Sequence, residues 1–462
     1  MDNEKFISLN EKIRELNGHD RYLSAFSIGA DSIASLLRVR ELGTFDTYDG
    51  AILYYMFMFP DICWIDEFIE YIQKQLKIKI IQTPSPVTLE CLSSAVYQNP
   101  HTTYGIFELQ KTDNYIPRLK RDDAVEIMRD IYNIPGSYTS VGIKSGDSAQ
   151  RRIYLRKYEG INESVLSWYP IWDFENRDVI EIIKRHGIKM SLCYRLSGIS
   201  TEQIDHRFIE PLRKYYVQGY NCIKKYFPMI DGQRLRIERY KPEYIEPKKG
   251  VFYGKFECLY PDGYTENDFP IEKMVNKKTG RGALSPREFR KLFEDRWEFE
   301  GDMTSNLHIV FGSEKERSEF IKNKIKIVSD YYCFFEDVEK LFKKNDNTIN
   351  NVCEFDTDFS VDFGAFDFDL DFDENEITEV DDGDINITEI CKNEIRKQMV
   401  DIERFSGEFL EKNNLKKDEK YWITIIFEDS NKKKIFLDKY YLSDLIECGD
   451  ILFYRKIKEV FG

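Results

Sequence analysis

The chain has 462 residues, 42% of them hydrophobic, and a formal net charge of −15 at pH 7. This length predicts two or three domains with enough apolar side chains to form their cores. The negative charge argues against broad binding of nucleic acid or anionic membranes, although it leaves open a nucleic-acid partner for a local basic patch. Residues 1–5 lack the basic and apolar regions of a signal peptide, and no long apolar run occurs, so we expect a cytoplasmic protein without membrane contact.

The first informative segment is residues 27–32, Ser-Ile-Gly-Ala-Asp-Ser, which follows a short apolar strand and opens a helix. Gly29 lets backbone N–H groups approach an anion, and Ser27 and Ser32 add hydroxyl donors. A helix N-terminus also favours negative charge, while Asp31 suits either a helix cap or a magnesium ligand. The segment predicts a phosphate-binding turn, and the alternative is a capped turn without a ligand.

The elements after this turn alternate between helix and strand. Apolar periodicity predicts helices over residues 32–42 and 66–76 and strands over residues 50–59 and 78–83. Such alternation is typical of a parallel sheet, whose ligands bind outside the carboxyl ends of the strands. We therefore expect residues 27–32 and the turn Phe59-Pro60-Asp61 to face one site.

Residues 139–152 repeat the same form, with a short strand, a polar turn containing Gly142 and Lys144, and then Arg151 and Arg152. Paired guanidinium groups can hold phosphate oxygens in bidentate fashion. The alternative for the two arginines is a solvated start of a helix. The segment Tyr169-Pro-Ile-Trp-Asp173 and a predicted helix over residues 177–186 follow.

Together these segments resemble the adenine-nucleotide α-hydrolase, or PP-loop, fold. Within it they are most similar to the phosphoadenosine phosphosulfate reductase-like family, and especially to its bacteriophage branch. The resemblance covers roughly residues 5–235 and rests on segments 27–32, 142–152 and 169–173. It implies an α/β fold with a parallel sheet, followed by α+β extensions, and it implies host cytoplasm if the chain is encoded by a phage.

The resemblance also implies site residues. The implied ligand is ATP or a related adenine nucleotide, and Mg²⁺ is a possible accompanying ion. Its phosphates would contact Ser27, Gly29, Asp31 and Ser32, and its polyphosphate would also contact Arg151 and Arg152. Phe59 and Asp61 would lie near the base or the ribose. Many relatives carry lysine where this chain has Ala30, so Lys144 or an arginine would have to supply that charge. Asp31 and Asp173 are the carboxylates expected near the metal or the incoming nucleophile, and they are the candidate catalytic residues.

The cysteines argue against sulfonucleotide reduction. None of the nine forms a Cys-x-x-Cys pair, so no iron–sulfur cluster is expected, and the sequence does not end in the Cys-containing tail of true reductases. Cys193, beside Tyr194 and Arg195, is expected to be a buried structural thiol. ATP pyrophosphatase chemistry, which adenylylates an unidentified acceptor, is then the predicted activity. The alternative is a non-catalytic binding or structural protein that reuses the fold.

The sequence divides into a nucleotide-binding domain (1–235), an α+β extension (236–350), an acidic linker (351–385) and a small C-terminal module (386–462). The extension is predicted to contain a strand over 307–311 and a helix over 313–324. Residues 354–384 hold fourteen Asp or Glu and no Lys or Arg, which suits an inert linker or a docking segment for a protein partner. The C-terminal module is predicted as a helix over 385–415, a hairpin over 421–437 and a helix over 443–460, and it suits interaction or oligomerisation.

Overall fold

The computed structural model of the chain describes residues 3–42, 51–57, 61, 63–84, 97–114, 121–196, 206–240, 247–249, 256–270, 272–274, 306–322, 325–329, 331–343, 386–448 and 450–461. Phe59 and the acidic segment 354–384 lie outside these ranges.

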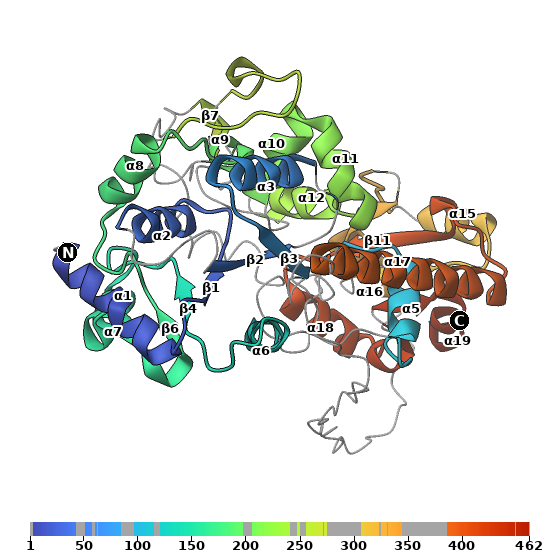
Figure 1. The fold of residues 1–462 in the computed structure, drawn as a ribbon. Helices are drawn as coiled ribbons and strands as arrows, with labels where there is room; N and C mark the ends of the chain where they lie inside the picture. The colour runs from blue at the N-terminus through green and yellow to red at the C-terminus, as the bar shows by residue number, and fades with distance from the viewer. Residues whose placement is uncertain are drawn as a thin grey trace.

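Among the described residues, six strands form one sheet in the order β3-β2-β1-β4-β6-β5 (Figure 1). All neighbours run parallel except β5, which is antiparallel to β6. The register pairs Leu23 of β1 with Ile52 of β2 on one side and with Thr139 of β4 on the other. The strands are β1 (Tyr22–Ala25), β2 (Ala51–Phe57), β3 (Ile80–Pro84), β4 (Thr139–Val141), β5 (Ile161–Asn162) and β6 (Ser167–Trp168). The predicted α/β class with parallel strands is confirmed.

Helices cover both faces of this sheet. Ile80 and Ile81 are consecutive on β3 and enter different cores, because side chains alternate along a strand. Figure 1 shows α2 and α3 on one side of β1–β3 and α6 on the other. The helices next to the sheet are α1 (Asn3–Asn17), α2 (Ala30–Glu41), α3 (Cys63–Leu76), α6 (Arg121–Ile131), α7 (Ala149–Tyr158) and α8 (Asn176–Arg185). Their bounds match the predicted helices at 32–42, 66–76 and 177–186 to within three residues.

The largest core continues past the predicted domain boundary at residue 235. Phe269 is fully buried in it, and Phe256, Leu259, Tyr260 and Tyr264 pack against it. Helices that extend this part of the molecule are α9 (Leu192–Leu196), α10 (His206–Tyr215), α11 (Val217–Tyr226) and α12 (Asp231–Tyr240). Residues 256–269 therefore belong with the first unit rather than with a separate extension. A short antiparallel pair, β7 (Pro247–Lys249) with β8 (Glu272–Met274), lies nearby in sequence.

The second half forms a mixed sheet in the order β10-β11-β9-β13-β12. Its strands are β9 (Asn306–Val310), β10 (Tyr332–Phe334), β11 (Trp422–Ile426), β12 (Ile446–Cys448) and β13 (Ile451–Phe453). Its helices are α15 (Glu314–Lys322), α16 (Phe335–Lys343), α18 (Ser430–Lys439) and α19 (Tyr454–Phe461). Since β11 lies between β10 and β9, the predicted extension and C-terminal module are parts of one sheet.

Two predicted elements of the C-terminal segment are wrong. Residues 433–437 were expected as the second strand of a hairpin, but they lie in α18, whose N-cap Asp429 accepts a hydrogen bond from the Lys432 N–H. Residues 443–460 were expected as one helix, but they form a 3₁₀ turn, β12, β13 and α19. Ile451 and Leu452 are fully buried, so an apolar run there fills a sheet core rather than a helix face.

Helix α17 (Ile387–Lys412) joins the two halves by packing on α5 (Pro100–Leu109), as Figure 1 shows. A Cβ on Gly105 would lie 2.5 Å from the Ile402 carbonyl oxygen, so the helix backbones meet closely here. At one end of α5 the His101 ring contacts Trp422 of β11 edge-on, with centroids 5.7 Å apart. Burial lowers the pKa of His101 to about 4, so its neutral form is the one that packs here.

No helix in the described ranges has the length and apolar character needed to cross a lipid bilayer.

Candidate functional site

The strand order places a topological switch point between β1 and β4. From β1 the chain proceeds to β2 and β3 on one side, whereas β4 adds on the other side. In open parallel sheets, ligands bind in the crevice outside the carboxyl ends of the strands at such a point. The two turns that flank it are residues 26–29, between β1 and α2, and residues 142–148, between β4 and α7. Both turns were singled out from the sequence.

The two turns touch through their backbones. A Cβ added to Gly142 would lie 2.7 Å from the Asp31 carbonyl oxygen and 2.8 Å from the Ser32 Cα. Real side chains do not tolerate such distances to main-chain atoms, so glycine is required for the β4 turn to lie against the first turn of α2. This approach brings the side chains of the next few residues into one cluster.

Lys144 lies at the centre of that cluster. Its Nζ donates to an Asp31 carboxylate oxygen at 2.6 Å and lies 2.7 Å from an oxygen of Asp147. The Lys144 side chain is 4% exposed, against 33% for Asp31 and 19% for Asp147. A buried ammonium needs such partners, because an unpaired charge in this position would be strongly disfavoured. Lys144 therefore places its positive charge beside Asp31, the residue directly after Ala30.

The two carboxylates that share Lys144 differ in their electrostatics. Burial raises the pKa of Asp31, and the hydrogen bond and charge of Lys144 offset this only in part. Burial also acts on Asp147, but Lys144 and Arg151 together hold its pKa below the ordinary value. Asp31 is therefore the easier of the two to protonate.

The predicted polyphosphate arginines lie on the first turn of α7. Arg151 donates to Asp147 at 2.6 Å, which extends the charged cluster from Asp31 through Lys144 to Arg151. Its backbone N–H donates to the hydroxyl of Ser148, the N-cap of α7. Arg152 is exposed, and no contact ties it to the cluster in the described structure. Of this pair, Arg151 is the one that the structure brings to Lys144.

The residues of the first turn that were predicted to bind phosphate also bond to one another and to α9. The Ser27 N–H donates to the Ser32 hydroxyl at 3.2 Å, and that hydroxyl donates to the Gly29 carbonyl at 2.9 Å. The Ala30 N–H donates to the Tyr194 hydroxyl at 2.6 Å. Ser27 is exposed, whereas Gly29 and Ser32 are buried. An anion at this helix N-terminus would thus approach Ala30 from the position that the Tyr194 hydroxyl occupies.

Asp173 belongs to a different cluster. Its carboxylate accepts from Arg38 of α2 at 2.6 Å, and the two side chains are 11% and 5% exposed. The Arg38 guanidinium lies between the rings of Phe6 and Phe174, at 4.3 and 4.4 Å from their centroids, and also donates to the Pro170 carbonyl. Burial acts to raise the pKa of Asp173, but the hydrogen bond and charge of Arg38, together with the chain's N-terminal amino group, hold it below the ordinary value. The contacts describe a buried ion pair that fixes α2 to the segment after β6.

Asp61, the predicted neighbour of the base or ribose, is paired with the C-terminal half of the chain. Arg396 of α17 donates to one Asp61 oxygen at 2.6 Å and to the other at 3.2 Å. Asp61 follows β2, so it lies near the carboxyl end of a strand next to β1, as the sequence predicted. Phe59 lies outside the described residues.

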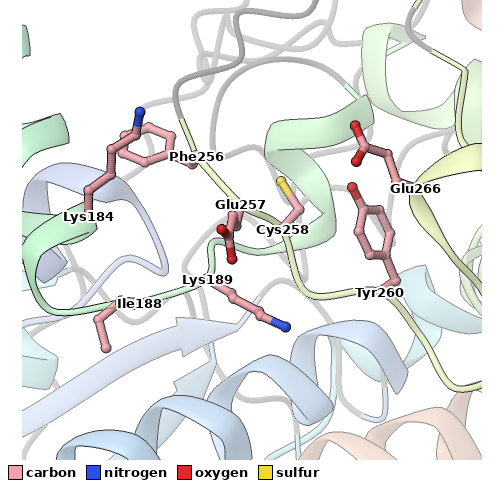
Figure 2. A pocket seen from close by; sticks show the side chains of 9 residues that line it. Lys184, Ile188, Lys189, Phe256, Glu257, Cys258, Tyr260 and Glu266 are labelled. Atoms are coloured by element: carbon pink, nitrogen blue, oxygen red, sulfur yellow. The ribbon is translucent and has the colours of Figure 1, made fainter.

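A separate cavity of about 790 Å³ lies beside α9. Figure 2 shows Lys184, Glu257, Cys258 and Tyr260 around it, together with the other lining residues. Phe256 at its wall contacts the Tyr194 ring edge-on at 5.4 Å, and the Tyr194 hydroxyl in turn accepts from the Ala30 N–H of α2. Burial raises the pKa of the Cys258 thiol to about 12, which leaves it unreactive at neutral pH.

Cys193 is fully buried, as expected of a structural thiol. Within the described residues, no three His, Cys, Asp or Glu side chains gather as a metal-binding group.

Three residues of this region were not assigned a role from the sequence. Asp147 completes the cluster around Lys144, Tyr194 caps the first turn, and Arg396 engages Asp61. The spacing of Asp147 three residues after Lys144 and four before Arg151 is a local signal that could have revealed it. The contact of Arg396 spans 335 residues and has no local signal.

A comparison with protein-family models returned no match to this chain, and neither did a comparison with curated protein sequences.

Proposed function

We propose that the chain binds an adenine nucleotide at the switch point between β1 and β4, with Lys144 as the main cation for its phosphates. The observation that carries this proposal is the buried Lys144 ammonium, which is held by Asp31 and Asp147 between the two turns. A lysine so placed neutralises phosphate as a point charge, and the first turn of α2 adds favourable polarity. Lys144 would thus supply the charge that Ala30 does not.

The proposed activity is adenylylation rather than sulfonucleotide reduction. An oxygen of the acceptor would attack the α-phosphorus, the bond to the bridging oxygen would break, and pyrophosphate would leave with the electron pair. Asp31 is the candidate for accepting the proton of the nucleophile, because its raised pKa brings it closer to the range of a useful general base. Positioning and charge neutralisation by Lys144 and Arg151 would contribute most of the rate, and Mg²⁺ carried in with the nucleotide would supply further charge neutralisation.

One observation favours a non-catalytic scaffold as the second candidate. The N–H groups of Ser27 and Ala30 already have partners within the protein, so the first turn is satisfied without an anion. A scaffold that keeps the fold but binds no nucleotide would leave these bonds undisturbed.

Isothermal titration of the full chain with ATP, AMP and phosphoadenosine phosphate, each with and without Mg²⁺, distinguishes the two candidates. Lys144→Gln should weaken binding of the preferred nucleotide by tenfold or more, since a charge-assisted contact to phosphate contributes about 1.5–3 kcal/mol. Lys157→Gln is the matched control, because Lys157 lies in α7, the helix that follows the Lys144 turn, is exposed and contacts the Tyr158 ring. Absence of binding by the wild-type chain would favour the scaffold.

Pyrophosphate release tests the catalytic part. Asp31→Asn and Arg151→Ala should each reduce the rate sharply once the acceptor of the adenylyl group is found, and wild-type rates in both variants would remove them from the proposed site.

A further inference from the structure

We infer that Arg396 of α17 competes with the bound ligand for the Asp61 carboxylate, so that the C-terminal half of the chain sets the affinity of the nucleotide site. This inference rests on the proposed function. It follows from where Asp61 lies, how Arg396 holds it, and what else holds α17 in place.

Asp61 lies at the edge of the sheet where the strands have their carboxyl ends, which is the edge along which a nucleotide would bind. It comes four residues after the end of β2, next to β1, whose turn begins the phosphate site. In dinucleotide-binding sheets of the Rossmann type, a carboxylate that follows the phosphate-binding turn accepts a hydrogen bond from a ribose hydroxyl group, and we give Asp61 the corresponding role. Both of its oxygens are taken by the Arg396 guanidinium, at 2.6 and 3.2 Å. Each oxygen keeps a second lone pair, so a ribose hydroxyl competes with Arg396 for the lone pairs that face the guanidinium and for the space in front of them.

Other contacts of α17 keep the helix in position when Arg396 moves. Lys392, one turn earlier, donates to Asp66 of α3 at 2.8 Å, and its side chain is 9% exposed. The Thr388 hydroxyl accepts from the Gln82 N–H of β3 at 3.0 Å. Further along, the helix lies against the backbone of α5 at Gly105. Release of Asp61 is therefore a movement of one side chain rather than of the helix.

Arg396 has a second set of partners that it keeps on leaving Asp61. Its Nη1 donates to Glu389 at 2.7 Å and to Asn393 at 2.6 Å, both on α17 itself. The side chains of Arg396 and Asp61 are 38% and 42% exposed, so neither becomes a buried unpaired charge when they separate. The Asp61–Arg396 pair can therefore separate without leaving a buried charge, in contrast to the more buried contact of Lys392 with Asp66.

The competition predicts the sign of a mutational effect. Arg396→Ala should lower the dissociation constant of the preferred nucleotide by about two- to fivefold, the range set by an exposed ion pair. Arg404→Ala is the matched control, because Arg404 is exposed on the same helix and pairs only locally, with Asp401 and Glu408. Titration calorimetry on the full chain measures both, and thermal unfolding checks that each variant folds.

Asp61→Asn completes the cycle. Asp61→Asn should weaken nucleotide binding. Adding Arg396→Ala to Asp61→Asn should have no further effect, because the carboxylate for which Arg396 and the nucleotide compete is then absent. Weaker binding by Arg396→Ala in the wild-type background would make Arg396 a ligand contact and overturn the inference, as would unchanged binding. If neither the wild-type chain nor Arg396→Ala binds any of the nucleotides, the proposed function fails; nucleotide binding without an effect of Arg396→Ala refutes the competition alone.

Discussion

Replacing Asp173 with asparagine tests whether this residue is structural or catalytic. The Arg38–Asp173 pair is buried, and Arg38 is enclosed by two aromatic rings, so Asp173→Asn leaves an uncompensated guanidinium inside the protein. Breaking a buried pair costs about 3–5 kcal/mol, and the lower end applies because asparagine still accepts one hydrogen bond. About 3 kcal/mol corresponds to a fall of about 6–12 °C in the unfolding temperature of a unit of this size. Differential scanning calorimetry measures this directly.

The matched control is Glu163→Gln, which removes the exposed pair with Lys12 and should change the free energy of unfolding by no more than about 1 kcal/mol. Nucleotide affinity of Asp173→Asn should stay close to that of the wild-type chain at temperatures well below unfolding. An unchanged unfolding temperature combined with lost pyrophosphate release would refute the structural role and restore Asp173 to the catalytic role that the sequence suggested.

Three further predictions follow from single residues. The folded-state pKa of His101 is about 4, against an ordinary value of 6.5, so the stabilisation from its neutral ring is complete above pH 6.5. As the pH falls from 6.5 to 4, the free energy of unfolding should decrease by about 3 kcal/mol, because the unfolded chain binds the proton first. Urea unfolding across this range should show a shallower pH dependence for His101→Phe than for the wild-type chain. Gly142→Ala should destabilise the first unit by about 1–3 kcal/mol in thermal unfolding, whereas Gly146→Ala, with its nearest atom at 3.7 Å, should be close to neutral. Gly105→Ala should speed hydrogen exchange in α17, and the same rate as in Gly407→Ala, which meets nothing within 4 Å, would contradict the close helix contact.

The first half of the fold could be predicted because its signals are local. The helices at 32–42, 66–76 and 177–186 have apolar stripes, and the strands between them are short apolar runs, so their types and near bounds follow from periodicity. In the second half, the strand at 307–311 and the helices at 313–324 and 385–415 were predicted to within three residues, but residues 433–437 were not. They read Lys-Lys-Ile-Phe-Leu, a short apolar run after two lysines that fits a strand as well as a helix. Burial of Lys433, Phe436 and Leu437, which share one helix face, decides for α18. Phe436 and Leu437 pack into the core of the second sheet, which is assembled from segments about 100 residues apart.

The candidate site shows the same division. The two turns could be found from the sequence, because a Gly-containing polar turn after an apolar strand has a chemical reason that is visible locally. The pairing of the charged side chains could not be predicted from the sequence. Asp173 was expected near the nucleophile, but the structure pairs it with Arg38, 135 residues away. Asp61 was expected beside a ligand, and its partner in the structure is Arg396.

The two halves of the chain are interleaved around α17. β11 lies between β9 and β10, and α17 ends ten residues before it, so the position of α17 is fixed by the second sheet as well as by α3, α5 and β3. The Asp61–Arg396 contact is the exposed part of that interface, whereas the contacts at Lys392 and Gly105 are its buried part. Exposed ion pairs separate at little free-energy cost, whereas buried ones do not. A bound ligand would therefore displace the Arg396 side chain while the two halves stay in contact.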